Sequence, residues 1–189
     1  MPAQFVHLRL HSAFSLTEST LRIGTLTKLV SGDSQPAAAI TDTNNMFGAM
    51  EFAQSMAAAG VQPIMGTQIE LEDKAGRGDV VLLAQNETGY VNLSQLLSKI
   101  LLSNDAAQTP ACDVEDLACY SDGLILLTGG ALSGFVGGPA GDGRAHLAQQ
   151  RLEKTGRLLC PAAFISNCNA MDCQRNLLAN HTFLIVLIA

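Results

Sequence analysis

Apolar residues recur along the chain in short continuous runs, separated by stretches in which they follow a helical spacing. The runs typical of buried strands lie at residues 5–10, 37–40, 61–71, 79–84 and 123–128. The helical spacing occurs at residues 21–30, 46–59 and 89–102. Residues 72–78 are polar and predict a turn. The chain is therefore predicted to alternate strands with helices.

This alternation is typical of an α/β fold with parallel strands and outer helices, because parallel neighbours need crossover connections. Continuous apolar runs also indicate strands that are covered on both faces. A closed barrel and an open doubly wound sheet both satisfy the pattern. In either one, functional side chains are expected at the carboxyl ends of the strands. The polar residues at those ends are His11, Asp42, Gln68 and Asn86.

Composition limits the functions that the chain can perform. It has 189 residues, of which 48% are hydrophobic and 15% charged, so it can bury a core. Its formal net charge is −6, and its 11 Lys and Arg residues are scattered. Phosphate neutralisation by basic side chains supplies most of the affinity of DNA-binding surfaces. We therefore expect no direct DNA binding from this segment.

The cysteines indicate neither a disulfide framework nor a zinc site. Their number, five, is odd, and no Cys-x-x-Cys pair or signal peptide is visible. A zinc site would need four ligands at short paired spacings. The apolar run at residues 183–189 is shorter than the ~20 residues of a membrane helix. We expect a cytoplasmic chain with reduced thiols and no contact with a membrane.

Five sequence blocks, in order along the chain, carry a family resemblance. They read VHLRLHSAFSL, AITDTNNMFG, GVQPIMGTQ, VLLAQNETGYVNL and GLILLTGG. Together they resemble the PHP (polymerase and histidinol phosphatase) domain that begins bacterial DNA polymerase III alpha subunits. The fourth block is similar to the replicative polymerases in particular. The resemblance implies that residues 1–158 form a partial PHP domain, a distorted (β/α) barrel with a metal site at the carboxyl ends of its strands.

The resemblance also implies where the metal ligands should be. The positions that match the family's ligands are Arg9, His11, Asp42, Thr43, Gln68 and Asp79. The family usually has histidine at the positions of Arg9, Thr43 and Asp79, and glutamate at that of Gln68. His11 and Asp42 alone retain the expected residue type, so the resemblance implies a degenerate site with no metal cofactor.

Simple electrostatics supports this interpretation. Arg9 stays protonated in proteins, so it places a fixed positive charge where a dication would lie. A salt bridge from Arg9 to Asp42 would stabilise the site without metal. The alternative for Asp42 is that it caps the turn at residues 43–45. His11 is expected to be a hydrogen-bonded residue rather than a ligand, and His7 to be structural.

Three functions compete. The first is a non-catalytic scaffold that docks the proofreading exonuclease subunit and the remainder of the polymerase holoenzyme. The second is a metal-dependent PHP phosphoesterase or 3′–5′ exonuclease, and the third is an enzyme similar to histidinol phosphatase. The lost ligands disfavour the last two. The palm aspartates that hold Mg²⁺ have no counterpart here, so DNA-directed DNA polymerase activity in DNA replication is expected of a parent subunit, not of this chain.

Residues 159–189 do not continue the resemblance, and they hold three of the five cysteines. Back-translating residues 164–176 and dropping two bases permits Tyr-Ile-Glu-Leu-Gln-Arg-His-Gly-Leu-Pro-Ala-Glu, in which the code forces Gly and both Leu residues. This peptide resembles the stretch that follows the fifth strand in the polymerase family. We therefore hypothesise that the chain is a truncated fragment with an out-of-frame tail.

The gene sequence tests this hypothesis. The codons of residues 160–176, read in the shifted frame, should encode Pro-Gly-Arg followed by the peptide above, and a polymerase reading frame should continue downstream. Codons that encode a different peptide in that frame would show that the tail is a natural divergent sequence.

Overall fold

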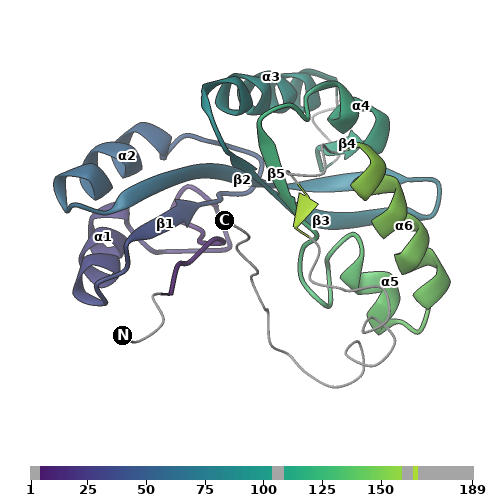
Figure 1. Cartoon of the computed structure of the whole chain (residues 1–189), viewed down its shortest axis with the longest axis horizontal. Helices are drawn as coiled ribbons and strands as arrows, with labels where there is room; N and C mark the ends of the chain where they lie inside the picture. Colours follow the sequence, from purple (N-terminus) through teal and green to yellow (C-terminus); the bar gives the residue numbers. More distant parts are fainter. Residues whose placement is uncertain (1–4, 104–108, 159–163, 166–189) are drawn as a thin grey trace.

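The computed structural model describes residues 5–103, 109–158 and 164–165, which form a mixed α/β fold (Figure 1). The helices are α1 (Ile23–Gly32), α2 (Ala49–Ala58), α3 (Glu87–Ser103), α4 (Val114–Cys119), α5 (Gly137–Gly141) and α6 (Ala145–Leu158). The strands are β1 (Ala37–Ile40), β2 (Gln62–Asp73), β3 (Gly76–Ala84), β4 (Ala111–Asp113), β5 (Leu124–Leu127) and β6 (Phe164–Ile165). The predicted tail lies outside the described residues except for β6.

The sheet is open and mixed rather than wholly parallel. Its strands follow the order β1-β2-β3-β5-β6, and β4 pairs with the far end of β2. β1 is parallel to β2 and β5 to β6, whereas β3 is antiparallel to both β2 and β5. The described strands do not close into a barrel, so the expectation of a barrel is not confirmed and that of uniformly parallel strands is wrong.

The reason for the antiparallel pairing lies in the connection between β2 and β3. Only Lys74 and Ala75 separate the two strands, and so short a link can join only antiparallel neighbours. Gly76 follows with a φ of 125°, which favours glycine. The polar stretch 72–78 is thus mostly strand, and the predicted turn shrinks to two residues.

The segment at residues 5–10 is extended but is not a regular strand. His7 forms an isolated parallel bridge with Ala38, and its carbonyl accepts a hydrogen bond from Ala39 N at 2.8 Å. Leu10 O likewise accepts from Thr41 N at 2.8 Å. The predicted first strand therefore lies beside β1 and places His11 and the loop after it at the carboxyl end of β1.

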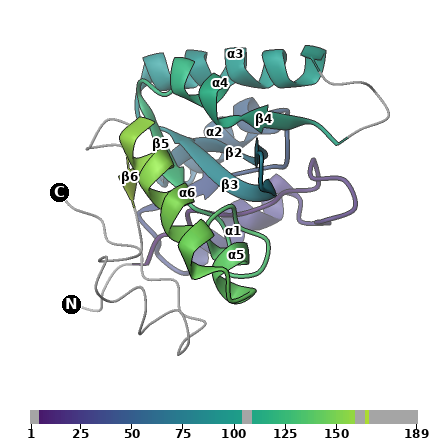
Figure 2. The ribbon, with the colours of Figure 1, turned by 90° about the vertical axis from the view of Figure 1, so that its right-hand side faces the viewer.

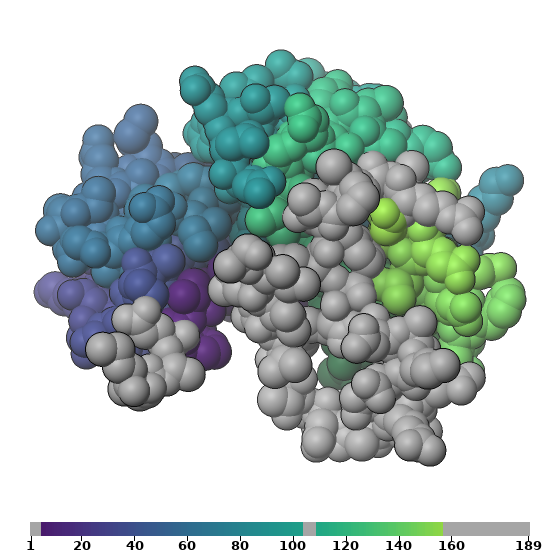
Figure 3. All heavy atoms as spheres, viewed as in Figure 1, coloured from purple at the N-terminus to yellow at the C-terminus, as the bar shows by residue number. Residues whose placement is uncertain are grey.

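Two groups of helices cover the sheet. α1 and α2 bury Ile23, Leu26, Phe52 and Met56 against β1, and they lie at one end of the sheet. α3 and α4 pack over the central strands through the apolar residues of each element, among them Leu71, Leu82, Leu93, Leu96, Val114 and Leu117. Figure 3 shows the same division, with the purple and blue N-terminal elements on the left and the green ones on the right, and in the side view of Figure 2 the green elements lie in front.

α6 is attached to the rest of the fold by a buried ion pair rather than by an apolar stripe. Arg151, only 3% exposed, donates to both carboxylate oxygens of Asp73 at 2.9 and 2.7 Å. It also donates to the carbonyls of Phe135 and Gly76 and lies 4.1 Å from the Phe135 ring centroid. The guanidinium thereby connects α6, the β2–β3 hairpin and the loop after β5.

Replacing this guanidinium should weaken the fold strongly. Arg151→Met keeps the length of the side chain but leaves Asp73 without its ionic partner, and breaking a buried pair in this way costs about 3 kcal/mol. We expect chemical denaturation to report a loss of this size in the free energy of unfolding. The matched control is Lys154→Met, which removes the exposed Lys154–Glu115 pair and should change little. Equal losses in the two variants would contradict the role of Arg151.

The effect should also depend on pH. Burial raises the pKa of the Asp73 carboxyl, but hydrogen bonds from Arg151 and Ala75 outweigh it and leave the pKa lowered. A carboxyl with a lowered pKa in the folded state stabilises the protein above its unfolded pKa of ~4, and the stabilisation is lost as the pH falls. The difference between wild type and Arg151→Met should therefore be full at neutral pH and shrink below about pH 4.

Candidate functional site

Asp42, directly after β1, is the buried centre of the candidate site. Its side chain is 2% exposed, and its Oδ1 accepts from Ser12 N and Ser15 Oγ, both at 2.6 Å. Its Oδ2 accepts from Ser12 Oγ at 2.7 Å. A buried carboxylate needs such donors because it has lost its hydration. Asp42 thus fixes the loop that follows His11.

These contacts correct both predictions for Asp42. Among the described residues, Asp42 forms no ion pair with Arg9, whose Nε donates to Gln68 instead. Nor does its carboxylate cap the turn at residues 43–45, because Asn44 N donates to Gln68 O at 2.8 Å. Ser12 and Ser15, in the preceding loop, supply the donors that the Asp42 carboxylate needs.

Gln68 on β2 connects Arg9 to His11. Its Oε1 accepts from Arg9 Nε at 2.9 Å and lies 3.2 Å from His11 Nε2. Arg9 can only donate, so the oxygen of the Gln68 amide, rather than its nitrogen, must face both residues. The glutamine carbonyl is therefore already engaged where the family pattern has a carboxylate.

Glu18, which the sequence did not predict, completes the network. Its Oε2 lies 2.8 Å from His11 Nδ1 and accepts from Thr43 Oγ1 at 2.7 Å. The two partners of His11 are the oxygens Gln68 Oε1 and Glu18 Oε2, one at each ring nitrogen. Glu18 lies in an irregular loop, where hydrophobic periodicity predicts nothing about side-chain positions. The only sequence signal is the high content of Ser and Thr between residues 12 and 20.

The pairing of β1 with β2 brings most of the predicted residues together. Thr43 and Gln68 form a parallel bridge, and Asp42 O accepts from Gln68 N at 3.1 Å and from Thr67 Oγ1 at 2.7 Å. Arg9 and His11 then reach Gln68 from the segment beside β1. The structure thus places five of the six predicted positions around one point.

Asp79, the sixth predicted position, belongs to a different environment. It lies on β3 opposite Glu70, and its backbone N–H donates to Ser133 O at 2.8 Å. Burial raises the pKa of the Glu70 carboxyl, Arg77 opposes this rise, and the charges of Asp79 and Glu72 add to it. Asp79 therefore acts on Glu70 rather than on His11 or Asp42.

Two other polar residues have structural roles. Asn86 Oδ1 accepts from Gly89 N at 2.9 Å, at the beginning of α3, and so lies outside the candidate site. His7 makes an edge contact with the Phe5 ring at 4.6 Å between centroids.

The described cysteines, Cys112 and Cys119, are free, and burial above all raises the pKa of the Cys112 thiol to about 12. The remaining cysteines lie outside the described residues.

The residues at the site do not fit a divalent metal. The Asp42 carboxylate already accepts three hydrogen bonds, the Gln68 oxygen accepts from Arg9, and Arg9 itself contributes a positive charge. A metal needs free carboxylate or imidazole donors. Within the described parts of the chain, no group of three or more His, Cys, Asp or Glu side chains could hold a metal ion.

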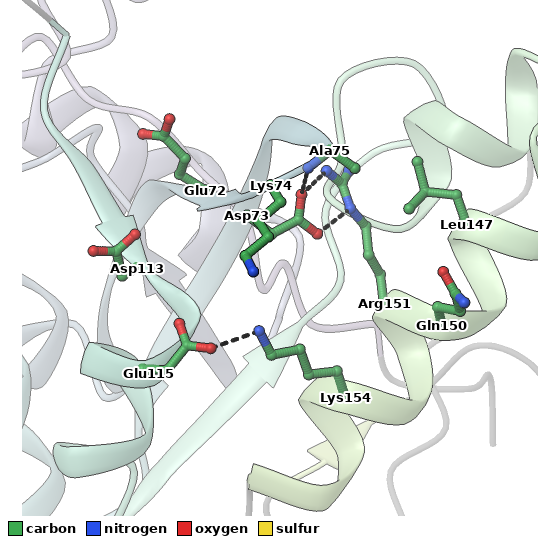
Figure 4. Close-up of a pocket in the computed structure, with 10 residues that line it drawn as sticks. All are labelled: Glu72, Asp73, Lys74, Ala75, Asp113, Glu115, Leu147, Gln150, Arg151 and Lys154. Atoms are coloured by element: carbon green, nitrogen blue, oxygen red, sulfur yellow. Dashed lines mark hydrogen bonds and ion pairs between the residues drawn. The ribbon is translucent and has the colours of Figure 1, made fainter.

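A groove of about 820 Å³ lies elsewhere, between the β2–β3 turn, the beginning of α4 and α6 (Figure 4). Asp73 and Arg151 face each other across it, as do Glu115 and Lys154. Hydrogen bonding to Lys154 lowers the pKa of the Glu115 carboxyl. The groove is thus lined by charges that are largely paired, and it holds none of the predicted site residues.

In the described residues we find no helix that is both long and apolar enough to span a membrane.

The chain is thus an α/β domain with an open mixed sheet and a cluster of polar side chains at the end of β1. The PHP domain model matches residues 7–170, and the chain belongs to the PHP domain family. It is 39% identical over 159 residues to the DNA polymerase III subunit alpha of Caulobacter vibrioides, covering 77% of this chain and 14% of that protein. It is 37% identical over 137 residues to that of Escherichia coli K12, covering 71% and 12%.

The similarity is to the N-terminal regions of these alpha subunits. The chain therefore spans only a small part, 12–14%, of the length of these relatives. Among solved structures, an amidohydrolase from Chromobacterium violaceum with bound sulfate and no metal aligns with a TM-score of 0.43 at 20% identity. That alignment covers 50% of this chain and 32% of the amidohydrolase chain.

The role of Asp42 can be tested by removing its carboxylate. Asp42→Ala leaves the buried N–H of Ser12 and the hydroxyls of Ser12 and Ser15 without their acceptor, so we expect a loss of about 3 kcal/mol in the free energy of unfolding. Denaturant unfolding measures the loss, and hydrogen exchange should show faster opening of residues 12–18. The exposed Asp33→Ala is the matched control and should stay within ~0.5 kcal/mol of wild type. An Asp42→Ala variant as stable as the control would contradict the role of Asp42.

Proposed function

We propose that this chain is a non-catalytic PHP segment of a replicative DNA polymerase III alpha subunit. It acts there as a structural platform and as a docking segment for the proofreading exonuclease subunit and the rest of the holoenzyme, in the bacterial cytoplasm. DNA synthesis belongs to the parent polymerase, and this segment does not grip DNA by itself. The similarity to alpha subunits supports the assignment to a polymerase.

The hydrogen-bond network at the end of β1 is the observation that carries the non-catalytic role. Arg9, Gln68, His11, Glu18 and Thr43 are linked in a continuous chain of contacts between 2.7 and 3.2 Å. Hydrolysis in this family needs a metal to polarise a water molecule. A network that engages the metal-facing groups with each other supports a structural use of the site.

A metal-dependent phosphoesterase or 3′–5′ exonuclease is the second candidate. The observation that favours it is the His11–Glu18 contact of 2.8 Å, because an imidazole oriented by a carboxylate is a common general base. The loss of the carboxylate at the position of Gln68 counts against this candidate. Metal content and phosphoesterase activity distinguish the two functions.

We expect the purified chain to retain zinc, manganese and magnesium only well below one equivalent after dialysis, as measured by elemental analysis. It should hydrolyse p-nitrophenyl phosphate no faster than buffer. The matched variant restores the family's ligand types by Arg9→His, Thr43→His and Gln68→Glu, and it should gain metal because imidazole and carboxylate donors then surround His11 and Asp42.

One tightly held metal per wild-type chain would overturn the non-catalytic role. So would phosphatase activity that disappears in His11→Ala, because a structural histidine has no part in turnover. Primer extension should be absent from both the wild-type chain and the restored variant, which separates the site from the polymerase reaction of the parent.

A further inference from the structure

The helix α3 presents to the surface a face that carries no charge. The helix lies along the outer edge of the molecule (Figures 1 and 2), and only Glu87 and Lys99 among its 17 residues are charged. Glu87 is its first residue, and Lys99 donates to Asp116 on α4 at 2.7 Å. The exposed residues between positions 90 and 102 are all uncharged: Tyr90, Val91, Ser94, Gln95, Ser98, Leu101 and Leu102. We call these residues the α3 face.

Apolar side chains occupy both ends of the α3 face. Tyr90 and Val91 are 42% and 46% exposed, and Leu101 and Leu102 are 48% and 87% exposed. In the middle of the face, the Ser98 hydroxyl donates to a backbone carbonyl of the preceding turn at 2.9 Å. This hydroxyl already has an acceptor within the helix, so a partner can cover it without leaving its hydrogen unpaired. The middle of the face can therefore be buried at little cost.

The order of residues along the α3 face is self-complementary. Four of them, Val91, Gln95, Ser98 and Leu102, are spaced so that they form one row along the helix. When two such rows run antiparallel, Val91 of one copy lies opposite Leu102 of the other, and Gln95 lies opposite Ser98. Apolar side chains then meet apolar ones, and the Gln95 amide meets a hydroxyl oxygen that can accept its N–H. A parallel arrangement would instead place each residue opposite its own copy.

The area of the α3 face suits a weak dimer. A large apolar side chain has roughly 200 Å² of surface, so the exposed parts of the four apolar residues amount to about 400 Å² per copy. With the polar residues between them, two copies bury on the order of 1,200 Å², the lower limit for specific interfaces. The chain as a whole has a net charge of −6, but the face itself adds no repulsion between two copies. Depletion of charge is also typical of interface centres.

We propose that the α3 face is a self-association surface, on which α3 of a second copy of this chain packs in the antiparallel direction. Both copies use the same residues, so the pair has two-fold symmetry and is closed. The symmetry of the row about its centre is what a second copy requires, whereas an unrelated partner has no need of it. The inference goes beyond the proposed function, because α3 carries none of the residues of the candidate site.

Sedimentation equilibrium of the full chain tests the proposal. Between about 1 µM and about 500 µM, a range chosen for an interface of this small size, the apparent mass should rise from 19.9 kDa toward twice that value. A chain that stays monomeric at every concentration would overturn the proposal and leave the face to a different protein. A mass that rises beyond two copies would also overturn it, because an isologous pair cannot grow further.

Paired charges distinguish the antiparallel arrangement from any other. Val91→Glu and Leu102→Lys, each alone, place two unpaired charges against apolar partners in every dimer and should weaken association by about tenfold or more. The double variant Val91→Glu/Leu102→Lys should recover to within about threefold of wild type, because each introduced carboxylate faces an introduced ammonium of the other copy. The two positions are about 16 Å apart along one helix, so they cannot pair within one chain. A double variant that associates no better than the single ones would overturn the antiparallel pairing.

The matched control is Leu29→Glu/Leu132→Lys, which introduces the same two charges on other parts of the surface. Leu29 and Leu132 are 56% and 90% exposed, and neither lies on α3. The control should associate as wild type does. Equal weakening in the control and in the single α3 variants would show a non-specific effect of exposed apolar residues and would overturn the proposal. All the substituted side chains are at the surface, so thermal unfolding should occur at the same temperature in every variant.

Discussion

The buried carboxylate of Asp42 is the group on which the arrangement around the end of β1 depends. A charge that is 2% exposed is costly unless donors surround it, and Ser12 and Ser15 supply them. Satisfying Asp42 fixes the loop after His11, and the loop in turn brings Glu18 to the imidazole. The backbone carbonyl of Asp42 meanwhile accepts from β2. One residue therefore joins the loop, β1 and β2.

The opposite end of β2 uses the same device with the charges exchanged. There a buried guanidinium, Arg151, is satisfied by Asp73 and by two carbonyls, and it fixes α6 as Asp42 fixes the loop. In both places a buried ion specifies a unique arrangement of segments that have few apolar residues of their own. Apolar burial determines the centre of the sheet and the packing of α1 and α2 on β1, whereas hydrogen-bonded ions fix the loop after His11 and α6.

This division explains what the sequence could predict. β1 at residues 37–40 and the apolar face of α3 follow from hydrophobic pattern alone, because burial decides them. α6 was missed because its inward residues, Ala148, Arg151 and Thr155, have no apolar period. The antiparallel hairpin was missed because polar residues near its turn concealed the strand ends. Five site positions were predicted through family motifs, whereas the Arg9–Asp42 pair was wrong because opposite charge alone does not reveal nearer serine donors.

The side chains at the end of β1 have one another as hydrogen-bond partners. Arg9 contributes a fixed positive charge, and the carboxylates of Glu18 and Asp42 are engaged by Thr43 Oγ1 and by the serine donors. A divalent ion would add two charges and require further carboxylates, which Thr43 and Gln68 do not provide. The residues at positions 9, 43 and 68 therefore act together: each would be unfavourable in a metal site, and together with His11 and Glu18 they form one hydrogen-bonded cluster.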